Sequence, residues 1–476
     1  MSHFLLPKEV ILVLLIVMTS IESRAEGILQ LWEHVIESNP TLKSSEHAVE
    51  QAKAQKDQAM AKLLPSMGVK GYYSFNSYNR NMEGGGFTLT GGTNTSYGGY
   101  MGSLQFTQAL FDLPSFLTLQ GADKQTQQQE QYALAQRMQV AYDLVDAYLN
   151  VLHAEDQIRQ LKGEIDASRT QLARLRKMHE QQMAKVTDLY EVEAYAQSLE
   201  TSEIEAEHEK AIATEKLREI SGVLVQHPEV LRQVDFPELK RNADEWVQEA
   251  LSSNPLLLSL QYGAESAQQM INSAQAQHLP TASFSAQETV ANTITNNLQV
   301  TPYNIGSLYL NVNIPLYQGG GVEAGVREQA QKYSMTREKI EETRRAIEKD
   351  TRTAWFNVVS GRSRIESSLK EVKFREKAKT AQETSYHSGV TTIVDLLDAH
   401  RRLLKGQTDF YKARYDFVRS LIRLRLNSGS LADIDLEVIS PWFGPTDDSA
   451  MNDVSVPKTI YEKGLHAKTP SSELVE

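Results

Sequence analysis

The stretch Val35-Ile-Glu-Ser-Asn-Pro40 returns 215 residues later as Ala250-Leu-Ser-Ser-Asn-Pro255. The same spacing carries Leu64-Pro65 onto Leu279-Pro280. Recurrence at one fixed spacing is the sequence signature of an internal repeat. The chain is therefore predicted to contain two copies of one structural unit.

The later part of each copy recurs at a slightly shorter spacing of 207 residues. Ala147-Tyr-Leu-Asn-Val151 matches Ala354-Trp-Phe-Asn-Val358, and Ser221-Gly222 matches Ser428-Gly429. The change in spacing falls among strands and loops, where length differences are tolerated. We predict a first repeat at 26–222, a linker at 223–241, a second repeat at 242–429 and a partly disordered C-terminal segment at 430–476.

Each copy begins with a predicted helix that a proline ends. Residues 29–62 are rich in Ala, Gln, Glu and Lys, and Pro65 and Pro280 stop the two helices. Beyond each proline the hydrophobic period becomes two, which is typical of strands. The predicted strands lie at about 66–78, 98–111, 281–291 and 305–317. A tilted strand of about 9–11 residues can cross an outer membrane, so these are long enough.

A helical pattern without proline follows each strand pair for roughly 65 residues, which corresponds to on the order of 100 Å of helix. Apolar residues there recur at steps of three and four, which is coiled-coil spacing. The clearest set is Met138, Ala141, Val145, Tyr148 and Leu152. The same spacing also fits an ordinary two-stranded scaffold.

Composition narrows the function classes. The 476 residues carry a formal net charge of −12, which disfavours nucleic-acid binding by phosphate neutralisation. The absence of Cys excludes disulfide frameworks, Cys-ligated metals and a thiol nucleophile. The sequence contains neither a His-x-x-x-His zinc-binding pair nor the Gly-x-Ser-x-Gly motif of a nucleophile elbow. We therefore predict no enzyme, no cofactor and no metal site.

The N-terminus carries the pattern of an export signal. An apolar run from Val10 to Val17 follows Lys8 and precedes small residues at Ser23 and Ala25. This pattern predicts a secretory signal peptide at 1–25. The mature chain is then expected in a bacterial envelope.

Four strands cannot form a lipid-exposed sheet by themselves. Open edges would leave backbone N–H and C=O groups in hydrocarbon, at several kcal/mol each. The smallest closed barrels have about eight strands. If these strands span a membrane, several chains must contribute to one barrel.

The layout resembles the TolC family of trimeric outer-membrane channel proteins. The strings that carry the resemblance are Ile314-Pro-Leu-Tyr-Gln-Gly-Gly320, Ser388-Gly-Val-Thr-Thr-Ile-Val-Asp-Leu-Leu-Asp398, Val186-Thr-Asp-Leu189 and Asn427-Ser-Gly429. The resemblance implies a mainly α homotrimer with a small β part: a twelve-strand transmembrane β-barrel, four strands per chain, and a periplasmic α-barrel of long antiparallel coiled-coil helices. It also implies a periplasmic adaptor, an inner-membrane ABC or proton-driven transporter, and contact with outer-membrane lipid.

The resemblance also suggests roles for residues at the helix breaks. Asp395 and Asp398 look like a pore constriction, although Thr392 and Asp395 also have the spacing of a helix-capping box. Tyr386 and Asp188 match family residues that act as an entrance latch. The alternative for Tyr386 is an ordinary aromatic side chain at the solvent edge of the helix. The adaptor-docking tip is then at Gly389 and Val390. Two positions depart from the family pattern: Thr391 replaces a basic residue, and Gln182 replaces a common Gly.

The predicted function is an exit duct in the outer membrane of a Gram-negative bacterium, reaching into the periplasm. It would pass proteins or small toxic molecules from an inner-membrane transporter to the exterior. The alternative is a periplasmic coiled-coil adaptor or scaffold with a small soluble β-domain. The two differ at the strands, since only a duct needs four membrane-length strands with a lipid face.

Overall fold

The computed structural model describes residues 27–80, 93–232, 236, 239–292, 302–431 and 433–444. The predicted signal peptide and the C-terminal segment beyond 444 lie outside the described residues. The chain divides into two compact units. The strand unit comprises residues 46–132 and 256–342, and the hairpin unit comprises 1–45, 133–255 and 343–476. Each unit therefore takes parts from both repeats.

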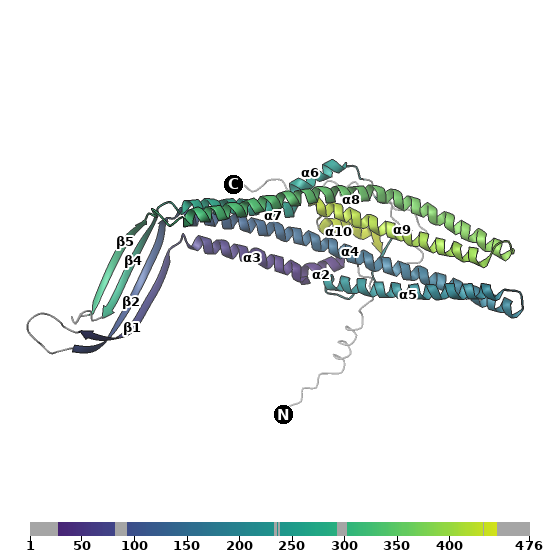
Figure 1. Ribbon diagram of the computed structural model, residues 1–476, viewed down its shortest axis with the longest axis horizontal. Helices are drawn as coiled ribbons and strands as arrows, with labels where there is room; N and C mark the ends of the chain where they lie inside the picture. Colours follow the sequence, from purple (N-terminus) through teal and green to yellow (C-terminus); the bar gives the residue numbers. More distant parts are fainter. Residues whose placement is uncertain are drawn as a thin grey trace, which may run out of the picture. The chain divides into compact units, whose positions relative to one another are not determined.

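The strand unit contains a four-stranded antiparallel sheet in the order β1-β2-β4-β5 (Figure 1). Its strands are β1 (Ser66–Arg80), β2 (Thr93–Phe111), β4 (Thr281–Asn292) and β5 (Tyr303–Asn313). The fourth strand ends before the predicted residue 317. Asn313 pairs with Thr281, the first residue of β4, so the chain beyond it has no partner in this sheet. Pro315 also lacks the N–H that a ladder needs.

Helices continue from the sheet within the strand unit. They are most of α3 (Pro40–Ala61), α7 (Pro255–Ala276), and the adjoining parts of α4 (Leu113–Glu180) and α8 (Gly321–His387). Lys56 Nζ on α3 lies 2.5 Å from Asp123 Oδ1 on α4. The hydroxyl of Ser266 on α7 donates to the carbonyl of Gly121 at 2.8 Å. These contacts hold α3 and α7 to α4.

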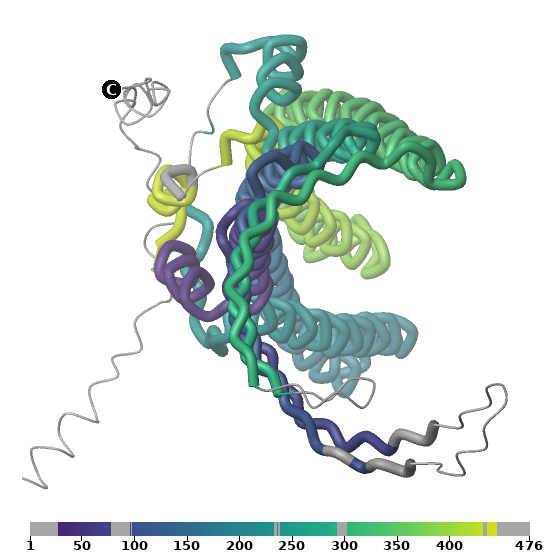
Figure 2. The backbone as a smooth tube through the Cα atoms, turned by 90° about the vertical axis from the view of Figure 1, so that its left-hand side faces the viewer, coloured from purple at the N-terminus to yellow at the C-terminus, as the bar shows by residue number. Residues whose placement is uncertain are grey.

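The hairpin unit is built around two long helical hairpins, which Figure 2 shows as separate pairs. Helix α4, 68 residues long, returns as α5 (Val186–Ser221), and α8, 67 residues long, returns as α9 (Ile393–Asn427). The shorter helices are α2 (Ile28–Ser38), α6 (Ala243–Ser253), α10 (Asp433–Ile439) and the 3-10 turn η1 (Ser440–Trp442). The core includes the fully buried Trp32, Leu144, Tyr148, Leu149, Phe417 and Val418. Each such side chain contributes roughly 1.5–3 kcal/mol by burial.

The single helix predicted for 29–62 is two helices, broken at Asn39. Its ψ of 123° is extended, because a following proline disfavours the helical conformation. The Asn39 Oδ1 then accepts from the backbone N–H of Thr41 at 2.9 Å and so caps α3. Asn254 has nearly the same backbone angles between α6 and α7.

A second, two-stranded sheet joins the stretch predicted as a linker to the segment predicted as a partly disordered C-terminus. Strand β3 (Val230–Leu231) pairs with β6 (Phe443–Gly444) in antiparallel fashion. Tyr148 donates its hydroxyl to the Glu229 carbonyl at 3.0 Å, and the buried Arg414 donates to the Leu231 carbonyl at 2.9 Å. These bonds bring the segment onto α4 and α9.

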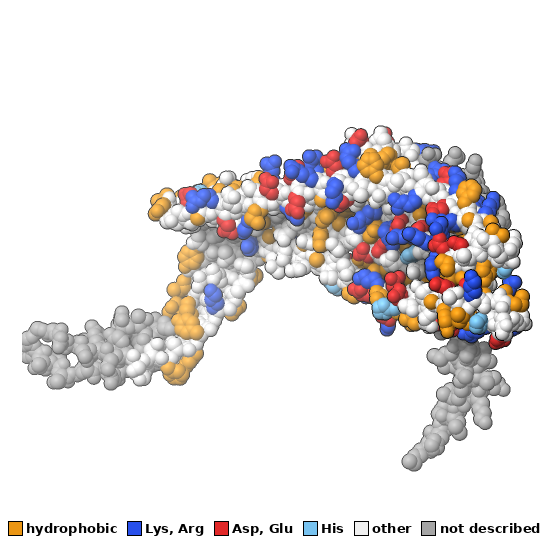
Figure 3. Space-filling view, turned by 45° about the vertical axis from the view of Figure 1, so that its right-hand side comes forward, with side chains coloured by type: hydrophobic (Ala, Val, Ile, Leu, Met, Phe, Trp, Pro, Cys, Tyr) orange, Lys and Arg blue, Asp and Glu red, His pale blue; other side chains and the backbone are white. Residues whose placement is uncertain are grey.

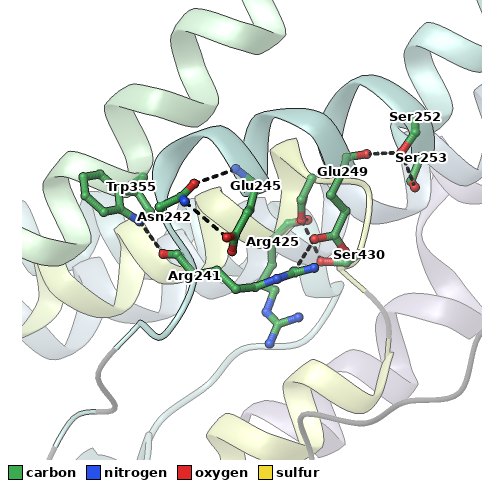
Figure 4. Close-up of polar contacts among 10 residues, drawn as sticks. Arg241, Asn242, Glu245, Glu249, Ser252, Ser253, Trp355, Arg425 and Ser430 are labelled. Carbon is green, nitrogen blue, oxygen red and sulfur yellow. Dashed lines mark hydrogen bonds and ion pairs between the residues drawn. The ribbon is translucent and has the colours of Figure 1, made fainter.

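The start of α6 is fixed by polar contacts (Figure 4). Asn242 is the N-cap: its Oδ1 accepts from the Glu245 backbone at 2.9 Å, and its amide donates to the Glu245 carboxylate at 3.1 Å. Trp355 on α8 donates its indole N–H to the Arg241 carbonyl at 3.1 Å, and Arg241 is ion-paired with Glu249. Helix α8 is thereby attached to the segment that opens α6.

Candidate functional site

The register of the sheet gives it two chemically different faces. Directly paired residues of antiparallel strands share a face. One row across the four strands consists of Leu308, Ala286, Phe106 and Met67, and the next row on the other face consists of Ser307, Gln287, Gln105 and Gly68. A slip of one residue would exchange the faces. In these two rows the observed register places apolar side chains on one face and polar side chains or Gly on the other.

The apolar face is exposed within one chain. Val69, Leu308 and Leu310 are 79%, 75% and 68% exposed. Hydrophobic side chains run along the strand section, while most charged side chains lie on the helices (Figure 3). On the opposite face Asn311 donates to Ser285 at 3.3 Å, and Gln287 donates to Thr289 at 3.0 Å. An exposed apolar face backed by a hydrogen-bonded polar face suits a boundary between lipid and water.

None of the helices in the described ranges carries an apolar stretch long enough to traverse a bilayer.

The two hairpin turns have the same backbone geometry. Gln182 and Gly389 both adopt the left-handed conformation, with φ of 61° and 73°. In the first turn the Met183 N–H bonds to the Met178 carbonyl at 2.8 Å, and in the second the Val390 N–H bonds to the Ser385 carbonyl at 3.0 Å. This pattern ends a helix through a left-handed residue, usually Gly. Gly389 and the 76% exposed Val390 lie at the tip of the second hairpin.

Asp395 and Asp398 lie in the first two turns of α9. Asp395 forms the capping box with Thr392: its backbone N–H donates to Thr392 Oγ1 at 3.3 Å, and its Oδ2 accepts from the Thr392 backbone at 3.1 Å. Hydrogen bonds from Thr392 lower the pKa of Asp395. Asp398 lies 2.6 Å from Arg402, which is one helical turn further along α9. This ion pair was not predicted. Hydrogen bonds thus favour the ionised form of Asp395, and Asp398 lies beside a positive charge.

Tyr386 and Asp188 lie on different hairpins, near the end of α8 and the start of α5. Tyr386 is half-buried and packs against an apolar cluster formed by α4, α5 and α9. Burial raises the pKa of the Tyr386 hydroxyl, and the negative charge of Asp188 adds to this effect. Among the described residues no hydrogen bond joins the two side chains; Asp188 accepts from Thr187 at 3.5 Å instead. The structure therefore brings the pair near each other without a direct bond.

Other polar contacts between the hairpins were not predicted from the sequence. Glu164 on α4 lies 2.6 Å from His400 on α9, and within the first hairpin Tyr195 on α5 donates to the same Glu164 oxygen at 3.1 Å. Arg174 Nη1 on α4 lies 3.4 Å from His387 Nε2 on α8. These residues occupy ordinary positions in the helical pattern, so nothing in it marks them as partners.

A metal site was not predicted, and the part of the chain that the structure describes holds no group of three or more His, Asp or Glu arranged to bind an ion.

Comparison with known proteins places this architecture in a family. The family described as Outer membrane efflux protein matches residues 31–223 and 246–430, which is most of the chain and covers both repeats. Outer membrane protein TolC of Salmonella enteritidis is 26% identical over 436 residues, covering 89% of this chain and 86% of that protein. Alkaline protease secretion protein AprF of Pseudomonas aeruginosa is 23% identical over 426 residues, covering 88% of each.

Solved structures share the fold. The crystal structure of the Campylobacter jejuni CmeC outer membrane channel superposes with a TM-score of 0.75 at 15% identity, over 88% of this chain and 90% of that one. The family match confirms the predicted resemblance. Of the two predicted functions, it supports the outer-membrane channel and not the periplasmic adaptor. The chain belongs to the outer membrane efflux protein family and is a TolC-like channel protein of the outer membrane that extends into the periplasm, not an enzyme.

Proposed function

We propose that three copies of this chain form one exit duct, with a twelve-strand transmembrane β-barrel and a periplasmic α-barrel. The observation that carries the proposal is the two-faced sheet with its two open edges. Strands β1 and β5 are the outer members of the sheet order, and each has one edge without a partner in that sheet. Unpaired backbone groups are costly in lipid, so these edges need partners from other copies.

The geometry of the edges supports a closed ring of identical chains. All three pairings in the sheet are antiparallel, so β1 and β5 run in opposite directions. Edge β5 of one copy can therefore continue the antiparallel pattern with edge β1 of the next. Such a head-to-tail contact forms a ring when the rotation closes. The number three comes from the resemblance to the trimeric family.

In this assembly Asp395 and Asp398 would line the entrance of the helical tube as a constriction. Three-fold symmetry would gather several carboxylates, which attract cations to a narrow opening. Arg402 beside Asp398 offsets part of that charge. Tyr386 and Asp188 would act as an entrance latch between the hairpins, and Gly389 with Val390 would contact a periplasmic adaptor.

The resemblance to the TolC family also implies the transport partners. A periplasmic adaptor and an inner-membrane ABC or proton-driven transporter would deliver cargo and supply the energy, so that the duct itself is passive. AprF is named for alkaline protease secretion, and PrtF of Dickeya chrysanthemi for protease secretion. Their similarity supports proteins, beside small toxic molecules, as cargo of this chain.

The test is the conductance of the purified protein in a planar lipid bilayer. We expect discrete steps that multivalent cations block from the entrance side. Replacing Asp395→Asn together with Asp398→Asn should weaken the block while keeping side-chain size. Arg402→Gln should strengthen it, because the guanidinium beside Asp398 is removed. Absence of conductance steps in the wild-type protein would overturn the duct, and an unchanged block in the double variant would remove the aspartates from the constriction.

A further inference from the structure

A polar cluster lies within the contact between the two helical hairpins. Its centre is Glu164 on α4, whose Oε1 accepts from His400 Nδ1 on α9 at 2.6 Å and from the Tyr195 hydroxyl on α5 at 3.1 Å. The Glu164 and His400 side chains are only 14% and 12% exposed. The contact thus joins α4 and α5 of the first hairpin to α9 of the second through a nearly buried carboxylate.

The surroundings of this cluster are apolar. The buried hydrophobic core at this contact comprises Ile158, Leu161, Ile165, Leu175, Val192, Tyr195, Leu199, Ala206, Ile393, Leu396 and Leu397. A buried carboxylate is costly unless it is paired and hydrogen-bonded. Glu164 meets that requirement only while the hairpins stay in contact, since His400 comes from the other hairpin. The polar pair therefore favours one arrangement of the two hairpins.

Both ring nitrogens of His400 face carboxylates. Nδ1 meets Glu164, and Nε2 lies 3.4 Å from Glu383 Oε1 on α8. Only the protonated imidazole can donate from both nitrogens, whereas the neutral ring presents a lone pair at one of them. The arrangement therefore suits a charged His400 bridging α4 and α8 through α9.

The other charged groups near the cluster are consistent with this arrangement. Lys379 on α8 lies 3.5 Å from Glu383, and Arg401 on α9 lies over the Tyr195 ring at 5.0 Å. Burial acts to raise the pKa of Glu164, but the hydrogen bonds from His400 and Tyr195, with the charges of His400 and Lys379, outweigh it and lower that pKa. Glu164 is thus held as the ionised acceptor that His400 requires.

The cluster lies on the same helix as the proposed constriction. Asp395 and Asp398 precede His400 on α9 by five and two residues, which at 1.5 Å per residue is within about 8 Å along the axis. Any movement of His400 away from Glu164 carries this end of α9 with it. The position of the two aspartates therefore depends on the contact.

We propose that Glu164, His400 and Tyr195 form a second, pH-dependent latch that holds the start of α9 against the first hairpin and so keeps the entrance closed. The inference rests on the proposed function, in which Asp395 and Asp398 line that entrance. The charged ring can donate to both carboxylates, and when it loses its proton it keeps a donor for only one of them. The entrance is then more tightly closed at pH 5.5 than at pH 8.

The direct test measures the separation of the hairpin tips. Met183 and Val390 are 69% and 76% exposed, and because the chain has no Cys, Met183→Cys with Val390→Cys gives two unique sites for spin labels. Labelled chains are diluted with unlabelled ones, and distances are measured by pulsed electron paramagnetic resonance. We expect a shift to longer and broader distances from pH 5.5 to pH 8.

Variants in the labelled background separate the latch from general stability. His400→Gln keeps a donor but does not titrate, so the pH-dependent shift should disappear. Glu164→Gln should give long distances at both pH values. The matched control is Glu200→Gln, which removes an ion pair with Arg169, 2.8 Å long, inside the first hairpin only, and it should behave like the wild type. A pH shift that persists in His400→Gln, or wild-type distances in Glu164→Gln, would overturn the proposal.

Bilayer conductance of the same variants distinguishes this proposal from the proposed function. If the wild type conducts and Glu164→Gln has an open probability no higher than that of Glu200→Gln, the latch proposal is wrong and the proposed channel function is retained. If the wild type does not conduct, the duct is wrong, while the label distances still decide whether the hairpin contact depends on His400.

Discussion

Asn39 and Asn254 occupy equivalent positions in the two repeats and make the same hydrogen bond. The Asn39 amide donates to the Ile220 carbonyl, and the Asn254 amide donates to the Asn427 carbonyl, each at 2.9 Å. In both cases the break between two short helices is tied to the end of the returning helix. The repeats therefore share a tertiary contact as well as an order of elements.

Replacing Asn39→Ala or Asn254→Ala should each lower the free energy of unfolding by about 1–3 kcal/mol, since a buried carbonyl loses its donor. Asn39→Asp keeps the acceptor that caps α3 but loses the donation to Ile220, so it separates the two roles. Urea unfolding followed by circular dichroism measures the effect. Midpoints equal to the wild type in both alanine variants would show that the contact contributes nothing.

Gln182→Gly should stabilise the first hairpin turn. Gln182 has a φ of 61°, and the left-handed conformation costs a non-glycine residue roughly 1–2 kcal/mol, of which the greater unfolded-state freedom of Gly returns part. A net gain of about 0.5–1 kcal/mol in thermal unfolding is expected.

The equivalent position provides the reverse control. Gly389→Ala should cost about 1 kcal/mol, and because nothing lies within 4 Å of an added Cβ, the cost reflects the backbone alone. Equal melting temperatures for wild type and Gly389→Ala would contradict this explanation.

Stability should depend on pH through Asp156, which accepts from the Tyr415 hydroxyl at 2.5 Å. Burial raises the pKa of Asp156 despite this bond and the nearby charges of Arg159 and Arg414. Because the folded-state pKa is above the unfolded value, the associated stability is present below the unfolded pKa and is lost as the pH rises through the folded pKa.

Asp156→Asn removes this titration and keeps an acceptor for Tyr415. It should therefore be more stable than the wild type at pH 8, and the difference should shrink as the pH falls through the raised folded-state pKa and the wild-type carboxyl becomes protonated. Asp156→Ala is the control, since it leaves the Tyr415 hydroxyl without this acceptor and should be less stable throughout. A wild type more stable than Asp156→Asn at pH 8 would show that ionised Asp156 stabilises the folded state, contrary to this prediction.

The two faces of the sheet should respond differently to charge. Leu310→Arg places a charge on the apolar face, which costs about 2–4 kcal/mol at the middle of a bilayer. Asn311→Arg, one residue away on the polar face, is the matched control. The amount of protein recovered in the outer-membrane fraction should fall for the first and stay near wild type for the second. Equal recovery would contradict a lipid-facing apolar row.

Much of the fold could be predicted because its signals are local. Alternation at Leu308, Leu310 and Val312 predicts a strand, and the family match confirms the outer-membrane function. The break at Asn39 was not predicted, although Asn-Pro recurs in both copies and a proline disfavours the helical conformation of the residue before it. The pairing of Asp398 with Arg402 could likewise have been read from their spacing of four residues.

The rest depends on contacts between distant parts of the chain. The β3 and β6 strands have two residues each and are far too short to show a period. Glu164 and His400 are separated by 236 residues, and neither differs in pattern from other polar residues on the same helices. Packing of the hairpins, which local sequence does not encode, brings them together.

In the proposed assembly the sheet is completed by other copies of the same chain. The most direct measurement is the molar mass of the protein extracted from outer membranes in mild detergent, determined by light scattering after size-exclusion chromatography and corrected for bound detergent. We expect a protein mass of three chains. A single-chain mass for protein that retains its strands would contradict it.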